Sequence, residues 1–275
     1  MYAESTIYAK EGMVVLMMTA LGAIDINSDV GESFGAWRMG YDEHTLASVT
    51  SANIACGFHA GDPITMRETV HIAAKLNVSC GAHPGYPDLV GFGRRDMAMS
   101  PDEAVADLAY QVGALWAIAH AEGVQLRHVK PHGALYNRAA RDHALALALA
   151  HAVRSLDLGL VLVGLAGSAM EQAAGETGIA FAREAFADRA YNSDGSLVSR
   201  SRPGAVIEDP AVVARRAVSI ARDGSIETYD GGRISLGAHT ICVHGDTRQA
   251  ADTARAVKEA IAAAGIRIEP LWKIV

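Results

Sequence analysis

Residues 23–29 read AIDINSD, a run in which apolar and polar side chains alternate. Successive side chains of a strand point to opposite faces, so Asp25, Asn27 and Asp29 share one face. The two isoleucines between them point the other way, which suits a covering layer of helices. Two carboxylates and an amide are costly to bury unless they are paired, hydrogen-bonded or bound to a metal. We therefore expect this strand to line a shared polar interior.

A second predicted strand repeats the pattern. In RHVKPHG (127–133), the side chains of His128, Lys130 and His132 share a face, with Val129 opposite. Further acids and bases stand at the same ends of the other predicted strands: His59, His83, Glu184, Asp188, Arg189, His244 and Asp246. The carboxyl ends of parallel strands hold the active site in α/β folds. We therefore expect a functional cluster at this end.

Short β-type runs alternate with Ala-rich helical runs along the rest of the chain. Strands are predicted at 23–29, 51–57, 77–83, 127–133, 160–167, 179–186 and 239–245. Helices are predicted near 63–75, 101–122, 140–154, 168–175, 209–222 and 247–263. The alternation indicates a parallel α/β domain, and polar residues converging from six or seven strands favour a closed barrel over an open doubly wound sheet.

Two local patterns refine this prediction. Asp62, Ser100 and Asp209 each precede a proline, which is typical of a helix N-terminus, and Glu103 completes a capping box with Ser100. The Gly- and Ser-rich stretch 191–204 is predicted to form a loop over the site.

Composition excludes several classes of protein. The 275 residues are 50% hydrophobic and 20% charged, which argues against disorder. The net charge is −7, from 31 acidic and 24 basic residues, so we expect no nucleic-acid partner. Three cysteines are too few for a disulfide scaffold and fit a reducing compartment, hence a cytoplasmic protein.

The N-terminal segment contains an apolar run, MVVLMMTALGA at 13–23. It is shorter than the roughly 20 residues that a membrane helix needs, so no membrane association is expected. We expect residues 1–22 to form a poorly ordered leader before one catalytic domain at 23–275. The alternative is a signal peptide, although the region before the apolar run is almost neutral.

Two tempting motifs are discounted. Cys56-x-x-His59 and Cys80-x-x-His83 resemble metal-ligand pairs, but residues three apart on a strand point to opposite faces. We expect the two cysteines to be small buried hydrophobes. The glycine-rich stretch 164–178 lacks the GxxxxGK[ST] pattern, and no GxGxxG follows a strand, so no known nucleotide loop is visible.

Six longer motifs resemble those of the LamB/YcsF family. They are IDINSDVGESFGAW (24–37), ANIACGFHAGDP (52–63), GAHPGYPDLVGFGRR (81–95), VKPHGALYN (129–137), REAFADRAY (183–191) and CVHGD (242–246). The resemblance extends from about residue 24 to the C-terminus. One departure is DINSDVGESFG, where family members often have DLNCDLGEGFG. Ser28 thus stands in place of a cysteine, which weakens any role for a thiol at that position.

The resemblance implies a fold and an activity. The family's fold is an irregular seven-stranded β/α barrel resembling the polysaccharide deacetylases. Its characterised members act as the A subunit of the prokaryotic 5-oxoprolinase. With subunits B and C, that enzyme opens the lactam ring of 5-oxo-L-proline to give L-glutamate. The reaction hydrolyses ATP, with Mg²⁺ as the counter-ion of the nucleotide.

The reaction that the resemblance implies suggests roles for the predicted site residues. Asp29 or His59 would be the general base that activates water. Lys130 and His132 would stabilise the developing oxyanion or a phosphorylated oxygen. Arg189 would grip the substrate carboxylate. Further substrate contacts are expected from Asn27, Glu32, His83, Glu184, Asp188, His244 and Asp246. The candidates for a bound divalent metal are Asp25, Asp29, His59 and His132.

Two rival functions stay open. One is a metal-dependent deacetylase or amidohydrolase that works alone, which the Asp and His content and the barrel analogy support. The other is a carbohydrate- or lactam-binding component without catalysis. So many convergent acids and bases weigh against a simple binder. ATP-independent activity with bound metal would favour the first rival, and ligand binding without turnover would favour the second.

Overall fold

A computed structural model describes residues 22–156, 158–243 and 250–275. Nearly all of the expected leader (1–22) lies outside the described residues, as do His244 and Asp246. No helix in the described ranges is long and apolar enough to cross a bilayer.

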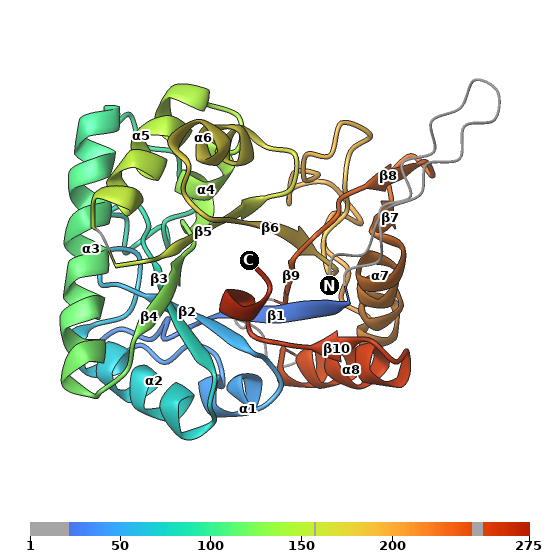
Figure 1. Ribbon diagram of the computed structural model, residues 1–275, viewed down its shortest axis with the longest axis horizontal. Helices are drawn as coiled ribbons and strands as arrows, with labels where there is room; N and C mark the ends of the chain where they lie inside the picture. Colours follow the sequence, from blue (N-terminus) through green and yellow to red (C-terminus); the bar gives the residue numbers. More distant parts are fainter. Residues whose placement is uncertain (1–21, 157, 244–249) are drawn as a thin grey trace, which may run out of the picture.

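Seven parallel strands form a closed ring (Figure 1). In order around the barrel they are β1 (Ala23–Val30), β2 (Ser51–Ala55), β3 (Ser79–His83), β4 (Leu126–Val129), β5 (Val161–Leu165), β6 (Phe181–Phe186) and β9 (Thr240–Cys242). Strand β9 pairs with both β6 and β1, and this closes the sheet. The short β10 (Arg267–Ile268) pairs with the first two residues of β1. The predicted closed barrel is confirmed.

Helices surround the ring and cover the outer face of the strands (Figure 1). They are α1 (Asp42–Leu46), α2 (Pro63–Lys75), α3 (Pro101–Ala121), α4 (Gly133–Ala139), α5 (His143–Ser155), α6 (Ala169–Thr177), α7 (Pro210–Asp223) and α8 (Ala250–Ala263). The three predicted caps are confirmed. Asp62 and Asp209 accept from backbone N–H groups of their helices, and Ser100 forms the full capping box with Glu103.

Some elements differ from the prediction. The fourth strand ends at Val129 because Pro131 has no N–H for a strand ladder and α4 begins at Gly133. Helix α4 itself was not predicted. Neither was the antiparallel hairpin β7 (Ser225–Glu227) and β8 (Arg233–Ser235). Both elements are short, so they span too few residues for a hydrophobic period to stand out.

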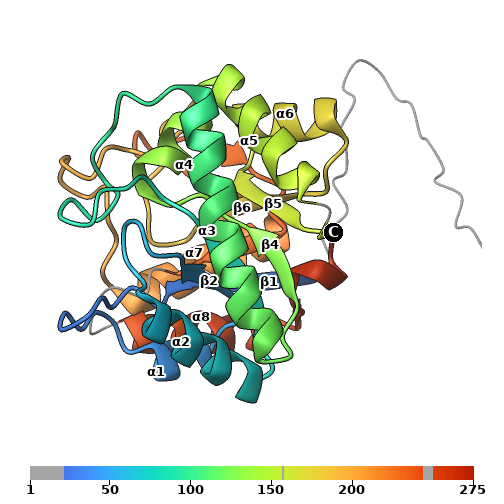
Figure 2. The ribbon, with the colours of Figure 1, turned by 90° about the vertical axis from the view of Figure 1, so that its left-hand side faces the viewer.

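The two ends of the barrel have different environments. At the amino end, the C-terminal turn η1 (Leu271–Lys273) lies over the ring, and Leu271 packs on interior valines of β5. The longer loops gather at the carboxyl end, away from the C-terminus (Figure 2). On the outer face, Ile24 and Ile26 are fully buried in the main core. The polar side of β1 therefore faces the barrel interior, as its alternation predicts.

Candidate functional site

A buried lysine joins three strands of the barrel. Lys130 follows β4 and is 2% exposed. Its Nζ lies 2.9 Å from Asp29 Oδ1 and 2.8 Å from Glu184 Oε1, and 3.2 Å from both Asn27 Oδ1 and Cys242 Sγ. Burial lowers the pKa of Lys130, but the nearby Asp29 and Glu184 carboxylates raise it more, and the net pKa lies well above its usual value. The side chain is therefore a permanent ammonium ion.

An amide bridge continues this network into β2 and β4. Asn53 Nδ2 donates to Asn27 Oδ1 at 2.7 Å and to Asp29 Oδ1 at 2.8 Å. His128 Nε2 lies 2.8 Å from Asn53 Oδ1, and burial, aided by the Lys130 charge, lowers the pKa of His128 to about 3. A neutral imidazole therefore orients the amide. Asn53 was not predicted as a site residue, although its place between Ser51 and Ala55 puts it on the inward face.

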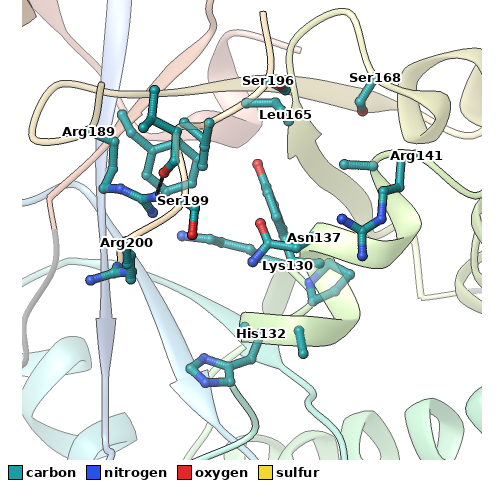
Figure 3. Close-up of a pocket in the computed structure, with 18 of the residues that line it drawn as sticks. Lys130, His132, Asn137, Arg141, Leu165, Ser168, Arg189, Ser196, Ser199 and Arg200 are labelled. Carbon is teal, nitrogen blue, oxygen red and sulfur yellow. Dashed lines mark hydrogen bonds between the residues drawn. The ribbon is translucent and has the colours of Figure 1, made fainter. Parts of the chain in front are cut away.

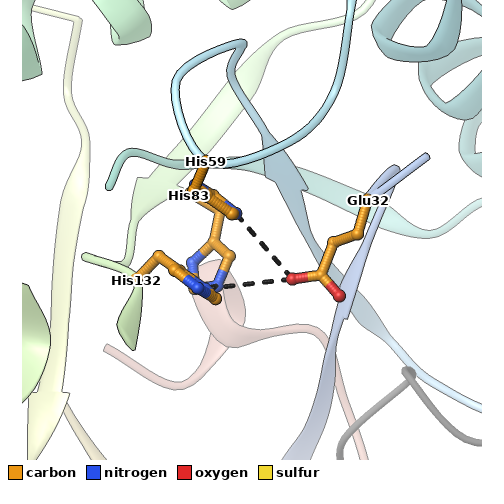
Figure 4. Close-up of side chains that lie close together, drawn as sticks. All are labelled: Glu32, His59, His83 and His132. Atoms are coloured by element: carbon orange, nitrogen blue, oxygen red, sulfur yellow. Dashed lines mark hydrogen bonds and ion pairs between the residues drawn. The ribbon is translucent and has the colours of Figure 1, made fainter. Parts of the chain in front are cut away.

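Four buried side chains gather beside this network, and we call them the histidine cluster (Figure 4). They are Glu32, His59, His83 and His132. One follows β1, one lies in the β2–α2 connection, one ends β3 and one precedes α4. Each offers a ligand atom, and these atoms lie within 4.8 Å of one another. Carboxylate and imidazole groups in this arrangement could hold a divalent cation.

Hydrogen bonds orient two of the imidazoles. His83 Nδ1 lies 2.7 Å from the Lys130 carbonyl oxygen, and His132 Nε2 lies 2.8 Å from the Phe92 carbonyl oxygen. A carbonyl only accepts, so both of these ring nitrogens donate. The opposite nitrogens, His83 Nε2 and His132 Nδ1, face each other at 3.0 Å.

His59 completes the cluster. Its ring stacks on that of His132, with centroids 3.7 Å apart and planes 1° from parallel. Its side chain is fully buried, and neither ring nitrogen has a hydrogen-bond partner among the described residues. Burial, with the neighbouring imidazoles, lowers the pKa of both His59 and His132 well below the usual value. Both rings are therefore neutral at physiological pH.

Close packing of the β3–α3 loop holds these rings. A Cβ at Gly85 would lie 2.7 Å from His59 Nδ1. Gly93 has φ +60°, and a Cβ there would lie 2.8 Å from the His132 ring. Buried Gln111 of α3 clamps Gly85 through two hydrogen bonds of 2.9 Å each, one to the backbone N–H and one to the carbonyl. The loop therefore packs directly against the His59 and His132 rings.

A cavity of about 580 Å³ opens beside the lysine (Figure 3). Five predicted site residues line it: Asp29, His83, Lys130, His132 and Arg189. So do residues 194–200, which places the predicted 191–204 loop over the site. The cavity wall also holds residues that the sequence analysis missed, among them Arg94, Asn137, Arg141 and Arg200. Arg189 and Arg200 lie on one side of the cavity and Arg141 on the other.

The remaining predicted residues lie around the cavity without lining it. Asn27 and Glu184 contact Lys130 but do not line the cavity, and Glu32 and His59 belong to the histidine cluster. Asp188 is buried and adjoins Arg189, but it is not among the lining residues.

The proposed metal candidates are regrouped by the structure. His59 and His132 stand together with Glu32 and His83, which the sequence analysis had placed among the substrate contacts. Asp25 belongs to a separate hydroxyl network. It accepts from Thr50, Ser51 and Thr240 at 2.5–2.7 Å.

Arg189 is held by its own loop. Its Nη2 donates to the Val198 carbonyl at 2.7 Å, and the residue is 6% exposed. Burial, with the nearby Arg200, lowers the pKa of Arg189 to about 10, so it remains a cation at neutral pH.

The cysteines Cys56 and Cys80, which the sequence analysis set aside as metal ligands, are buried and free, as predicted.

Comparisons with known proteins match the whole barrel. Residues 24–275 match the family described as LamB/YcsF family. The 5-oxoprolinase A subunit of Pyrococcus abyssi (strain GE5 / Orsay) is 50% identical over 248 residues, 90% of this chain and 97% of that protein. The 5-oxoprolinase A subunit of Acinetobacter baumannii (strain ACICU) is 52% identical over 247 residues, 90% of this chain and 97% of that protein. The crystal structure of a lactam utilization protein from Thermus thermophilus has a TM-score of 0.86 and 48% identity, covering 90% of this chain and 99% of that one.

Proposed function

Since the chain belongs to the LamB/YcsF family, we propose that it acts as the A subunit of an ATP-dependent 5-oxoprolinase. This enzyme opens the lactam ring of 5-oxo-L-proline to L-glutamate. Two relatives at 50% and 52% identity are named as the A subunit of 5-oxoprolinase, and a solved relative is named a lactam utilization protein. The matches cover nine-tenths of this chain and nearly all of each relative, so they support the same role for this protein.

The reaction explains the need for partners. Water adds across a stable amide bond, and phosphorylation of the lactam oxygen by ATP would activate the carbon that water attacks. This sequence contains neither of the known nucleotide loops, so we assign the use of ATP and its Mg²⁺ counter-ion to the assembly with subunits B and C. All three cysteines are free and buried, which supports a cytoplasmic location for that assembly.

The observation that carries the proposal is the charge of the cavity. Its wall includes Lys130 and four arginines against three carboxylates, those of Asp29, Asp96 and Asp194. The lysine charge is fixed by its two carboxylate partners. Such a cavity suits a small anionic substrate whose reacting oxygen gains negative charge. We place the 5-oxoproline carboxylate at Arg189 and the lactam oxygen at Lys130, because the N–H of His132 is donated to the Phe92 carbonyl.

The geometry favours one of the two candidate bases. Asp29 lines the cavity and is the more accessible group, whereas fully buried His59 is not among the lining residues. A general base must lie within hydrogen-bond reach of the water that it activates. We therefore propose Asp29 as the base. Glu184 and Asn53 then serve as positioning residues that hold Lys130 and Asp29.

The stand-alone amidohydrolase remains the second candidate, because the histidine cluster borders the same cavity through His83 and His132. Such an enzyme would release product from a lactam or acetamide without ATP and without partner subunits. ATP dependence therefore separates the two functions.

Asp29→Asn tests the proposal, because it removes the base while the Lys130–Glu184 pair remains. With subunits B and C, 5-oxoproline and ATP, we expect kcat for glutamate release to fall about 10²- to 10⁴-fold. Asp102→Asn, at an exposed position on α3, is the matched control and should keep full activity. Unchanged turnover by a folded Asp29→Asn chain would refute the assignment of Asp29.

A further inference from the structure

Two imidazole nitrogens of the histidine cluster face each other at hydrogen-bond distance. His83 Nε2 and His132 Nδ1 face each other at 3.0 Å, and each ring already donates through its other nitrogen to a carbonyl. With those two nitrogens donating, the facing pair has no N–H of its own to share unless a proton or a metal ion is added. The Glu32 carboxylate can only accept, and Asp29 Oδ2 lies 3.3 Å from His83 Nε2. Facing lone pairs repel, so this arrangement requires a cation.

The distances within the cluster fit one ion. Glu32 Oε1 lies 3.8 Å from His59 Nε2 and 3.8 Å from His132 Nδ1 (Figure 4). These separations are too long for hydrogen bonds. Two ligands on one tetrahedral zinc, with bonds of about 2.1 Å, stand about 3.4 Å apart. Both separations are about 0.4 Å longer than that value, and the 3.0 Å between His83 Nε2 and His132 Nδ1 is about 0.4 Å shorter. Small rotations of the parallel His59 and His132 rings would bring their nitrogens onto one ion.

His59 provides an independent observation. Its side chain is fully buried, and both ring nitrogens lack a hydrogen-bond partner in the described part of the chain. Leaving a buried polar atom unsatisfied costs about 1–3 kcal/mol. Gly85 and Gly93 pack directly against the His59 and His132 rings. A ligand on the Glu32 side of the ring would satisfy Nε2.

We propose that the histidine cluster binds one divalent transition-metal ion. Three imidazoles and a carboxylate suit zinc and its first-row neighbours, whereas Mg²⁺ and Ca²⁺ prefer all-oxygen sites. The hydrogen bonds from His83 to the Lys130 carbonyl and from His132 to the Phe92 carbonyl supply the orienting contacts that metal-binding histidines ordinarily have.

His83 and His132 also line the cavity, so an ion bound by the histidine cluster would lie beside the substrate. A catalytic role for that ion rests on the proposed function. A bound ion supplies Lewis-acid polarisation of an oxygen beside it. Binding itself is measured without turnover, so failure of the ring-opening proposal and failure of the metal proposal are distinguishable.

The test uses the untagged full chain, stripped with a chelator, exposed to Zn²⁺ and desalted. Elemental analysis should then find about one zinc per chain. Co²⁺ in place of zinc should give the visible absorption of a site with nitrogen and oxygen ligands. Thermal unfolding of the stripped chain should shift upward by several degrees when Zn²⁺ is in large excess over its Kd.

Matched variants locate the ion. Glu32→Gln keeps the shape of the side chain, and His59→Ala removes the unpartnered ring; each should lower zinc affinity at least 10-fold and abolish the cobalt spectrum. His71→Ala, at an exposed position on α2, should bind like the parent chain. If His59→Ala does not fold, the zinc affinity of Glu32→Gln and the zinc content of the parent chain still test the proposal. A folded parent chain holding less than about a tenth of an equivalent would overturn the proposal, as would full binding by Glu32→Gln. In the first of these cases, a proton shared by the facing imidazoles would be the cation.

Discussion

Asp25 offers a quantitative test of the barrel interior. It is fully buried at the amino end of β1, and burial raises its pKa from 3.8 to about 6 despite three hydroxyl donors. The pKa in the folded state lies above that in the unfolded state, so the folded chain binds the proton more tightly. The stability that this carboxyl contributes is therefore complete at acid pH and is lost as pH rises through about 4 to 6. The full loss is about 3 kcal/mol.

Asp25→Asn removes this titration. Urea unfolding at several pH values should show that the parent chain loses about 2 kcal/mol relative to the variant between about pH 4.5 and about pH 7.5. Any hydrogen bond that the amide lacks adds a constant offset and does not change the difference between the two pH values. A parallel pH dependence of the two proteins would refute the reasoning. Such a result would show that burial does not raise the pKa of Asp25.

Four further substitutions test charge, packing and substrate contact. Lys130→Met leaves two buried carboxylates without their cation and should cost about 3–5 kcal/mol in urea unfolding; a loss under about 1 kcal/mol would contradict the ion network. Gly81→Ala places a Cβ against the His128 ring and should cost about 1–3 kcal/mol. Gly113→Ala, in open space on α3, should instead stabilise by up to about 1 kcal/mol, and equal melting temperatures would contradict this contrast. Arg189→Gln should raise KM for 5-oxoproline about 10- to 100-fold in the reconstituted enzyme, whereas an unchanged KM would place the carboxylate elsewhere.

The barrel follows from alternation that is visible in the sequence. The order of Asp25, Asn27 and Asp29 predicts one inward face, and the structure places all three inside. Alternation cannot say which inward residues meet, because that depends on the register between strands. Asp29 pairs in register with Asn53, and only this neighbour relation reveals the amide bridge.

The histidine cluster was harder to predict because Glu32 and His59 lie in connections that strand periodicity does not describe. Glu32 follows a glycine with φ +69°, and His59 lies in a loop, so strand periodicity places neither side chain. The same limit applies to Arg141 and Arg200, which reach the cavity from loops. The motifs signalled a site at this end of the barrel, while its membership depended on loop geometry.

Omission of one component at a time tests whether ring opening needs this chain, both partner subunits and ATP. Glutamate and ADP are measured from 5-oxoproline and ATP with this chain, subunits B and C together, and then with each protein or ATP left out. We expect glutamate only in the complete mixture, with ADP formed in proportion to it. Glutamate from this chain alone without ATP would contradict it and favour the amidohydrolase. No glutamate from a complete mixture of folded subunits would also contradict it.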